Sequence, residues 1–487
     1  MTKDTDLYRI LIKGGVLSPN ELKQIVNLGN MLQLSTISFG SRQDILLPNV
    51  EGMERAIDQF PELDINFVAD RKFQNVVSSY VSANIFKSTT WLKGSTYLYI
   101  LSTFEYKPKL KVNIVDPRQR LVPLITGDLN FIASDIDDYW YLYLRFPGEK
   151  TLKRFPVLVF SWDIAKMAKM IEDAILKDDN TDVDDLYVDI INSFENCRAI
   201  IKDLKINYEP FPNYEGINQE GLDSYWLGLY WRNNKYDLKF LDAMADFCLR
   251  WNVGRISITP WKSFIVKGIP TNSLLDLEKM LGKFGINTRH SSLELNWHLP
   301  VNIEEALDLK RFIVRTFDQN DISTNGLTFG ISNYKGAIEF TSIVIRKNEA
   351  PMQFKDFEIR PTYDVLYSEN FDANTQIYKV YAQDVDKMEL PGLLMELSKM
   401  YFDQLEKDTA HLQLAPVTKK KEVKNVHLIH QCKSCLNVYD AHYGDEVRGI
   451  APGISFEDLV SDYSCALCDG PKENFEVKSA DEVYVLA

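Results

Sequence analysis

Apolar residues recur at the spacing of one helix face early in the chain and then alternate with polar residues. The helical positions are Leu22, Ile25, Leu28 and Leu32, and the alternating positions are Ile37, Phe39, Ile45 and Leu46. Apolar residues three and four apart predict an amphipathic helix, and alternation predicts half-buried strands. We therefore expect a helix followed by strands in this segment.

The same order of patterns returns much later in the chain. The second set comprises Leu241, Met244, Phe247 and Trp251 at helical spacing, followed by Ile256, Ile258, Phe264 and Ile265 at strand positions. Leu22 corresponds to Leu241, and most of the other matched positions share the same offset. A repeat at such a long distance predicts two similar halves of α+β class.

Length and charge narrow the class of protein. At 487 residues, with 45% hydrophobic and 12% aromatic residues, the chain is too long for one core and should form several domains. Its formal charge of -14 argues against nucleic-acid and anionic-membrane partners. No apolar run approaches the roughly 18 residues of a membrane span, and residues 1–6 show no export signal, so we expect a cytoplasmic protein.

Four of the six cysteines form two close pairs, Cys432 with Cys435 and Cys465 with Cys468. Two Cys-x-x-Cys pairs suit a tetrahedral metal site, because each pair wraps one side of the ion. Zinc and iron both fit this spacing. The other two cysteines lie far apart in sequence, and Cys248 follows Phe247 in an apolar stripe, which indicates a core position.

The residues between the pairs narrow the choice of metal. They include Gly444-Asp445, Gly449-Ile450-Ala451-Pro452-Gly453 and Phe456-Glu457-Asp458-Leu459. With these motifs, residues 429–477 closely resemble rubredoxin. The resemblance implies one ferric/ferrous iron per chain, with Cys432, Cys435, Cys465 and Cys468 as its ligands. A zinc ribbon without a redox role is the alternative.

The aromatic residues of this segment are dense enough for a small core that a metal completes; they are Tyr439, Phe456, Tyr463 and Phe475. Three positions depart from the usual rubredoxin pattern. Leu436 and Asp469 replace the glycine that follows each pair, and Ala466 replaces a proline. Such glycines allow positive φ angles, so Leu436 is expected to carry backbone strain. Residues 427–477 have a formal charge of -6, which suits a basic partner surface or serves only solubility.

A second resemblance involves the repeat. The motifs Gly14-Gly15-Val16-Leu17-Ser18-Pro19, Ile37-Ser38-Phe39-Gly40-Ser41-Arg42-Gln43 and Gly254-Arg255-Ile256-Ser257-Ile258-Thr259-Pro260 are similar to the ferredoxin-like half-domains of sulfite and nitrite reductases. The likeness would cover most of residues 1–405. It implies two pseudo-symmetric halves around a sirohaem that is coupled to a four-iron-four-sulfur cluster.

The ligands of that cluster are absent from the sequence. No cysteine lies between Cys248 and Cys432, and the turn at residues 330–336 has Ile331 and Lys335 where thiolates would be expected. Apolar and ammonium side chains cannot hold an iron-sulfur cluster, so none is expected.

Sirohaem carries eight carboxylates and needs a basic collar. The resemblance assigns this role to Arg42, Lys109, Lys111, Arg255 and Lys262. Gln74 stands where an arginine would be expected. Solvated surface charge is an equally good interpretation of each basic residue.

Other candidate sites are weaker. The acidic residues 178–185 space oxygen ligands as a calcium loop does, but Val183 replaces the required glycine, so we expect a solvated loop. His290 and His298 form no metal motif, and no phosphate-binding loop or catalytic triad stands out.

We therefore expect two reductase-like halves, a linker and a small metal-bound β domain. The predicted boundaries are residues 1–235 and 236–405 for the halves, 406–426 for the linker and 427–487 for the rubredoxin domain. A helix is expected to end near Leu405 and to run into a flexible linker with a reach of about 25 Å.

The expected function is one-electron transfer linked to inorganic nitrogen or sulfur reduction, with redox proteins as donor and acceptor. One alternative is a nitrite or sulfite reductase that keeps sirohaem or another tetrapyrrole and uses the rubredoxin iron in place of the cluster. Another is a partner-docking scaffold with structural zinc.

Overall fold

The computed structural model describes residues 6–70, 72–146, 148–149, 151–177, 182–288, 293–332, 339–348, 361–414 and 428–479, with the helical backbone alone for residues 407–414. Two compact units make up the chain, Met1–Asp408 and Thr409–Ala487. Among the described residues, no helix combines the length and the apolar character that crossing a membrane requires.

Two sheets of the larger unit contain the repeated segments. Sheet I has the order β15 (Tyr236–Asp237), β3 (Thr36–Phe39), β4 (Ile45–Pro48), β1 (Leu7–Ile10), β5 (Ile65–Phe67). Sheet III has the order β13 (Gly216–Glu220), β14 (Ser224–Leu229), β17 (Phe264–Pro270), β16 (Ile256–Ile258), β2 (Val16–Leu17). Their helices are α1 (Pro19–Met31), α2 (Met53–Ile57), α6 (Leu238–Arg250) and α7 (Leu274–Lys283).

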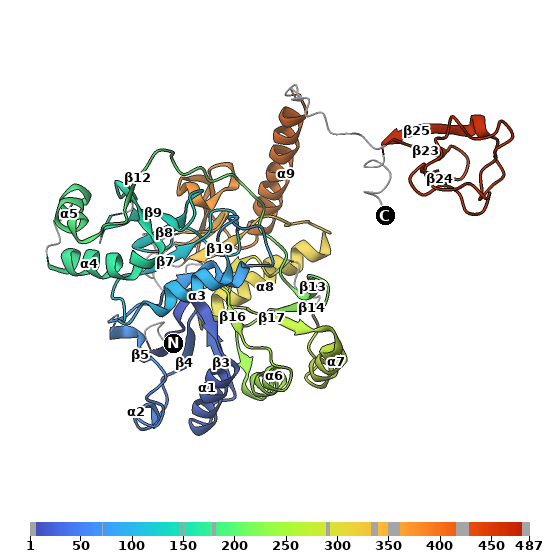
Figure 1. Ribbon diagram of the computed structural model, residues 1–487. Coiled ribbons are helices and arrows are strands. Elements are labelled where there is room, and N and C mark those ends of the chain that lie inside the picture. The colour runs from blue at the N-terminus through green and yellow to red at the C-terminus, as the bar shows by residue number, and fades with distance from the viewer. Residues whose placement is uncertain are drawn as a thin grey trace. The chain divides into compact units, whose positions relative to one another are not determined.

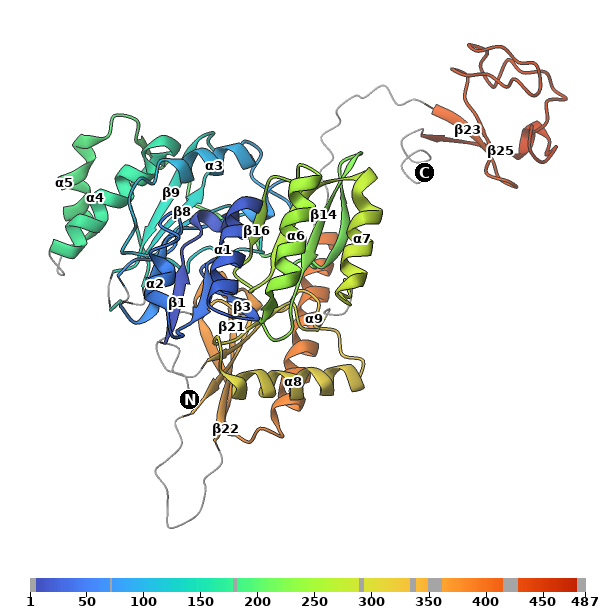
Figure 2. The same cartoon turned by 90° about the horizontal axis from the view of Figure 1, so that it is seen from below.

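The structure confirms the repeat. Both ends of α1 and α6 are related by the predicted offset, and so are their N-cap residues, Ser18 and Asp237, which each accept a hydrogen bond from a main-chain N–H of the first turn. The two helices lie side by side in Figure 2, and Lys23 of α1 forms an ion pair with Asp242 of α6. The expected pair of pseudo-symmetric halves is therefore present.

The short strands before these helices are exchanged between the sheets. β2 precedes α1 but pairs with β16 of sheet III, where Leu17 lies opposite Ile256. β15 precedes α6 but pairs with β3 of sheet I, where Tyr236 lies opposite Ile37. Each sheet is thus completed by a strand from the other repeat. The predicted boundary at residue 235 stays a prediction.

Two further sheets repeat a second pattern. Sheet II has the order β12 (Arg198–Ala199), β11 (Val157–Phe160), β9 (Tyr139–Leu144), β8 (Leu129–Ala133), β7 (Val112–Val115), β6 (Val77–Ser78), with β10 (Lys153–Arg154) on β9. Sheet IV has the order β18 (Trp297–His298), β19 (Phe329–Ser332), β20 (Ile343–Lys347), β21 (Tyr363–Ser368), β22 (Tyr378–Val385). In both sheets two parallel pairings are followed by antiparallel ones.

Helices connect these strands in matching places (Figure 1). α3 (Gly94–Ser102) joins β6 to β7, and α8 (Glu304–Gln319) joins β18 to β19. α4 (Ile164–Lys177) and α5 (Val183–Ile190) follow β11, and α9 (Leu390–Leu414) follows β22. Buried apolar side chains from both repeats share one core, in which Cys248 is fully buried as predicted.

Three local expectations need correction or limits. The helix expected to end near Leu405 continues to Leu414, because residues 406–414 contain good helix formers and no proline. Asp182 is not a free loop residue, since its side chain accepts a hydrogen bond from Val183 N and caps α5. Residues 178–181 and His290 lie outside the described residues.

The smaller unit is built around a sheet of order β24 (Val438–Tyr439), β23 (Leu428–Cys432), β25 (Phe475–Ser479). The predicted aromatic core is present. Phe456 lies 5.6 Å from Tyr439 and 5.1 Å from Phe475 between ring centroids, and Tyr463 lies 5.9 Å from Phe475. The Tyr439 hydroxyl donates to Ile454 O (2.9 Å), and the Tyr463 hydroxyl donates to Asp445 Oδ2 (2.8 Å), so the polar ends of both rings are satisfied.

Candidate metal centre

The four paired cysteines converge in the smaller unit. Cys432 is the last residue of β23, and the turn after it brings Cys435 beside the second pair. Their sulfur atoms all lie within 4.8 Å of one another. Cys432 Sγ is 3.7 Å from Cys468 Sγ, and Cys435 Sγ is 3.5 Å from Cys465 Sγ.

These distances fit one tetrahedral metal ion. Metal–sulfur bonds of about 2.3 Å in a regular tetrahedron place the sulfur atoms about 3.8 Å apart. The observed spacing is close to that value, so the cysteines can hold a single iron without rearrangement. Zinc–sulfur bonds have the same length, and the geometry alone does not choose between the metals.

The two cysteine turns are built alike. Leu436 N donates to Cys432 O (2.9 Å), and Asp469 N donates to Cys465 O (3.0 Å). Leu436 has φ 64° and Asp469 has φ 54°, which are the positive angles expected where rubredoxins carry glycine. The positive φ predicted for Leu436 is confirmed, and strain is expected there because a γ-branched residue rarely adopts this conformation.

Main-chain N–H groups surround the sulfur atoms. Donors to Cys432 Sγ are the N–H groups of Ser434 and Cys435, and donors to Cys465 Sγ are those of Leu467 and Cys468. The N–H groups of Asn437 and Gly470 donate to Cys435 Sγ and Cys468 Sγ. These dipoles stabilise negative charge on sulfur, as second-shell donors do in iron–sulfur proteins.

The thiol of Cys465 shows the effect most clearly. Burial opposes its ionisation, but the N–H donors outweigh burial and lower the pKa of Cys465 to about 6. The side-chain amide of Asn437 also donates to this sulfur, at 3.6 Å. The sulfur of Cys465 is therefore prepared to act as a thiolate ligand.

One contact to the centre was not predicted from the sequence. Arg448 Nη2 donates to Cys465 O at 3.0 Å and also forms an ion pair with Asp469. The only signal was compositional, since Arg448 is a basic residue in an acidic segment. Its guanidinium joins the loop after Gly444 to the second cysteine turn.

One side of the centre reaches the surface. Cys432 and Cys465 are buried, Cys435 is partly exposed and Cys468 is exposed. Leu436 and Leu467 flank this side and are 64% and 71% exposed. Electrons can therefore enter or leave over a short distance on this side.

The structure brings together two of the basic residues assigned to a sirohaem collar. Arg42 is partly exposed, and its guanidinium donates to Asn113 Oδ1 (2.7 Å), Asn75 O (2.8 Å) and Val112 O (3.0 Å). Burial lowers the pKa of Arg42 to about 10. Burial also lowers the pKa of Lys111, with Asp128 and Arg42 as charged neighbours.

The other three residues of the predicted collar have different surroundings. Lys109 is exposed and precedes β7 instead of lying on a strand, while its main-chain N donates to Glu172 Oε2. Arg255 is exposed. Lys262 donates to Leu299 O. Their assignment to a cofactor stays a prediction.

The repeat explains why Lys262 is not the counterpart of Arg42. By the offset that relates the two repeats, Arg42 corresponds to Trp261, whereas Gln43 corresponds to Lys262, and both Gln43 and Lys262 have positive φ, 59° and 60°. Trp261 is buried and donates from its indole N–H to Leu121 O (2.8 Å). An indole thus occupies the place of a guanidinium in the second half.

The cavities beside Trp261 are small for a tetrapyrrole. One of about 50 Å³ lies between sheets II and IV, with Trp261 and Phe340 in its wall, and another of about 240 Å³ is lined by Trp261 and Lys262. Cofactor pockets have roughly 300–1,000 Å³. Ile331, at a predicted thiolate position, packs in the core of sheet IV. Lys335 lies outside the described residues.

Comparisons with known proteins agree with both parts of this description. The rubredoxin family profile matches residues 429–475. The high molecular weight rubredoxin of Moorella thermoacetica is 35% identical over 151 residues, which cover 30% of this chain and 65% of the relative. Rubredoxin-1 of Pseudomonas putida is 46% identical over 44 residues, which cover 9% of this chain and 25% of that protein. This chain therefore spans less than two thirds of each relative's length.

A solved structure matches the remaining architecture. The NirA protein of Mycobacterium tuberculosis superposes with a TM-score of 0.60 over 80% of this chain and 80% of its own, at 15% sequence identity. The expected α+β fold of two similar halves is thereby confirmed as NirA-like. Residues 429–475 are a rubredoxin electron-transfer domain, carried by a chain that has the NirA-like fold over most of its length.

Proposed function

We propose that this protein is a one-electron carrier in which a single iron, held by Cys432, Cys435, Cys465 and Cys468, is the redox centre and the NirA-like unit is a scaffold. The observation that carries the proposal is the sulfur tetrahedron, within 4.8 Å, with main-chain N–H donors at every cysteine.

The chemistry of the centre follows from these groups. Iron bound to four thiolates supplies a ferric/ferrous couple. The N–H donors offset the extra negative charge that reduction places on the sulfur atoms. The aromatic core keeps the cysteine turns in place, and the exposed side at Cys468 gives partners access.

Two observations favour a scaffold without its own redox centre. The Nη1 and Nη2 groups of Arg42 already donate to Asn113, Asn75 and Val112, so these donors are used within the protein. The cavities of about 50 and 240 Å³ beside Trp261 are too small for a tetrapyrrole. We infer that electrons pass through the rubredoxin domain alone.

The process served by the carrier is inferred from the fold. Likeness to NirA supports a link to inorganic nitrogen or sulfur reduction, which is an argument by fold alone. Residues 427–477 carry a formal charge of -6, so a donor or acceptor with a basic face is the expected partner.

One cluster favours a second function, that of a reductase with sirohaem. Lys111, Arg42 and Arg145 lie around Asp128, and the Nε atoms of Arg42 and Arg145 are buried without a hydrogen-bond partner among the described residues. These three cations would bind some of the carboxylates of an anionic cofactor if Trp261 and its neighbours moved apart.

The visible spectrum and metal content of the aerobically purified full chain test these alternatives. One iron per chain with ferric-thiolate bands alone is the expected result. Additional haem-type bands with a second iron would establish the reductase. Zinc in place of iron would overturn both the electron-carrier proposal and the reductase alternative, and it would leave a structural metal site. Cys435→Ser is expected to abolish the ferric-thiolate bands, and retention of both spectrum and electron-transfer rate in this variant would contradict the proposal.

A further inference from the structure

A groove opens at the carboxyl ends of two parallel strands of sheet II. β7 ends at Val115 and β8 ends at Ala133, and these strands are parallel neighbours. The segment after β7 supplies Pro117 and Arg118 to the groove, and the segment after β8 supplies Asp135. In α/β sheets this edge is where ligands bind, because the loops that follow the strands converge there. The groove has a volume of about 520 Å³.

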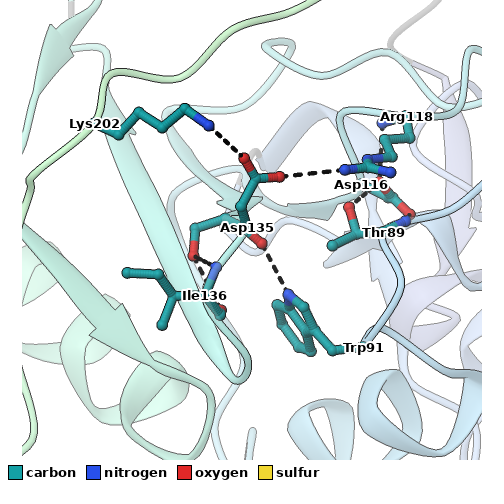
Figure 3. A network of polar contacts seen from close by, with 8 residues as sticks. Thr89, Trp91, Asp116, Arg118, Asp135, Ile136 and Lys202 are labelled. Atoms are coloured by element: carbon teal, nitrogen blue, oxygen red, sulfur yellow. Dashed lines mark hydrogen bonds and ion pairs between the residues drawn. The ribbon is translucent and has the colours of Figure 1, made fainter. Parts of the chain in front are cut away.

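Hydrogen bonds fix the segments after β7 and β8, which carry Arg118 and Asp135 (Figure 3). Asp116 accepts hydrogen bonds from Thr89 N (2.8 Å), Thr89 Oγ1 (2.8 Å) and Arg118 N (2.9 Å). The indole N–H of Trp91 donates to Ser134 O at 2.8 Å. These bonds fix the two loops that carry Arg118 and Asp135 in a preorganised arrangement.

Two cations share one carboxylate in the groove. Arg118 Nη2 lies 3.3 Å from Asp135 Oδ1, and Lys202 Nζ lies 3.3 Å from Asp135 Oδ2. All three side chains are half or more exposed, so these ion pairs contribute little to stability and can rearrange. An incoming anion can take the place of Asp135 between Arg118 and Lys202 and gain both cations.

A third cation is held in place without a carboxylate. Arg120 donates from Nη1 to Pro117 O (2.7 Å) and Gln119 O (2.8 Å), and from Nη2 to Asn207 O. Within the described part of the chain it forms no ion pair. Its guanidinium is therefore already ordered for a ligand, although Asp372 and Glu209 lie near enough to share its charge.

The groove is cationic in an acidic protein. Its basic residues are Lys87, Arg118, Arg120, Lys202 and Lys205, and its acidic residues are Asp135, Asp203 and Glu209. Glu209 pairs with Lys87, and Asp203 pairs with Arg154 outside the groove lining. Pro117, Ala133 and Leu204 add apolar surface.

We propose that this groove binds a small organic phosphate, with the phosphate between Arg118 and Lys202 and the organic part against Pro117 and Leu204. A planar guanidinium beside an ammonium is the arrangement that recognises phosphate oxygens. The volume suits a ligand of mononucleotide size. This function is separate from electron transfer by the rubredoxin domain.

Calorimetric titration of the full chain with AMP tests the proposal, with adenosine as the uncharged control. AMP is expected to bind and adenosine is not. The double variant Arg118→Gln/Lys202→Gln should weaken AMP binding by at least about tenfold. Asp135→Asn should instead tighten binding several-fold, because it removes the carboxylate that competes for both cations. A merely structural role for Asp135 does not predict tighter binding.

Lys239→Gln, on the exposed side of α6, is the matched control and should bind AMP as the unmodified protein does. Tryptophan fluorescence and the visible bands report whether each variant is folded. No AMP binding at millimolar concentration overturns the proposal. Equal binding of adenosine and AMP, or of the double variant and the unmodified protein, also overturns it.

Discussion

Lys23 Nζ lies 2.7 Å from Asp242 Oδ1, and Asp242 occupies the position in the second repeat that Lys23 occupies in the first. The residue pair therefore marks the pseudo-twofold relation between α1 and α6. Lys23 also lies 2.7 Å from Asp246 Oδ1, one turn further along α6. One ammonium thus pairs with two carboxylates and reduces the repulsion between them.

Replacing Lys23 by methionine should destabilise the larger unit by about 1 kcal/mol, since two partly exposed ion pairs are lost and the carboxylates are left together. All 8 tryptophans lie between Trp91 and Trp297, so tryptophan fluorescence during urea unfolding reports on this unit alone. Lys239→Met on α6 is the control. An equal shift of the urea midpoint in both variants would show that the ion pairs contribute nothing.

Leu436→Gly should stabilise the rubredoxin domain by about 1 kcal/mol, because glycine adopts φ 64° without the steric cost that leucine carries. The loss of the ferric-thiolate bands in guanidinium measures this change. Leu467→Gly is the matched control, since Leu467 is similarly exposed but has no positive φ. If both variants lower the midpoint, Leu436 is not strained.

Arg448→Gln should lower the reduction potential of the centre by tens of millivolts. Reduction adds a negative charge, and the guanidinium that donates to Cys465 O favours that state; 1 kcal/mol corresponds to roughly 40 mV for one electron. Asp469→Asn should raise the potential, and the double variant should lie between the two. Voltammetry measures all three, and a rise in Arg448→Gln would refute the electrostatic role.

The buried ammonium of Lys267 should make the free energy of unfolding depend on pH. Burial lowers its pKa from 10.5 to about 8, and its ammonium donates to Tyr80 O at 2.7 Å. Between pH 8 and 10.5 the unfolded chain binds more protons than the folded chain at this residue, so its contribution to stability rises with pH. Relative to Lys267→Met, the unmodified protein should gain up to about 3 kcal/mol across this window. A difference that stays constant with pH would contradict this.

Removing the metal should affect the two units differently. A chelator that bleaches the ferric-thiolate bands is expected to unfold the small domain, because its core depends on the metal. The urea midpoint measured by tryptophan fluorescence should not change, since the units Met1–Asp408 and Thr409–Ala487 are separate. A shift of that midpoint by the chelator would show that the units depend on each other.

The spacing of residues along the sequence was enough to predict the repeated helices and strands and the cysteine cluster. The helical and alternating positions from Leu22 to Leu46 located α1, β3 and β4, and the constant offset between the repeats located their counterparts. The cysteine spacing and the residues between the pairs identified the four cysteines that the structure brings together. Positive φ at Leu436 also followed from its position after the first pair.

Long-range relations could not be predicted in this way. The contact of Arg448 with Cys465 and that of Trp261 with Leu121 depend on how distant segments meet. The predicted end of α9 near Leu405 was wrong, because the sequence has no helix-breaking residue between Leu405 and Pro416. The groove at the end of β8 has no sequence motif, since its cations come from several separate segments.

The exchange of β2 and β15 has a consequence for cutting the chain. A fragment that ends before Tyr236 would lack β15, which pairs with β3. The complementary fragment would lack β2, which pairs with β16, and also β13 and β14, of which β14 pairs with β17. Each fragment would then expose a sheet edge whose natural cover is on the other fragment. Two such fragments, produced separately and mixed, should reassemble into a nicked protein, in the manner of split reporters.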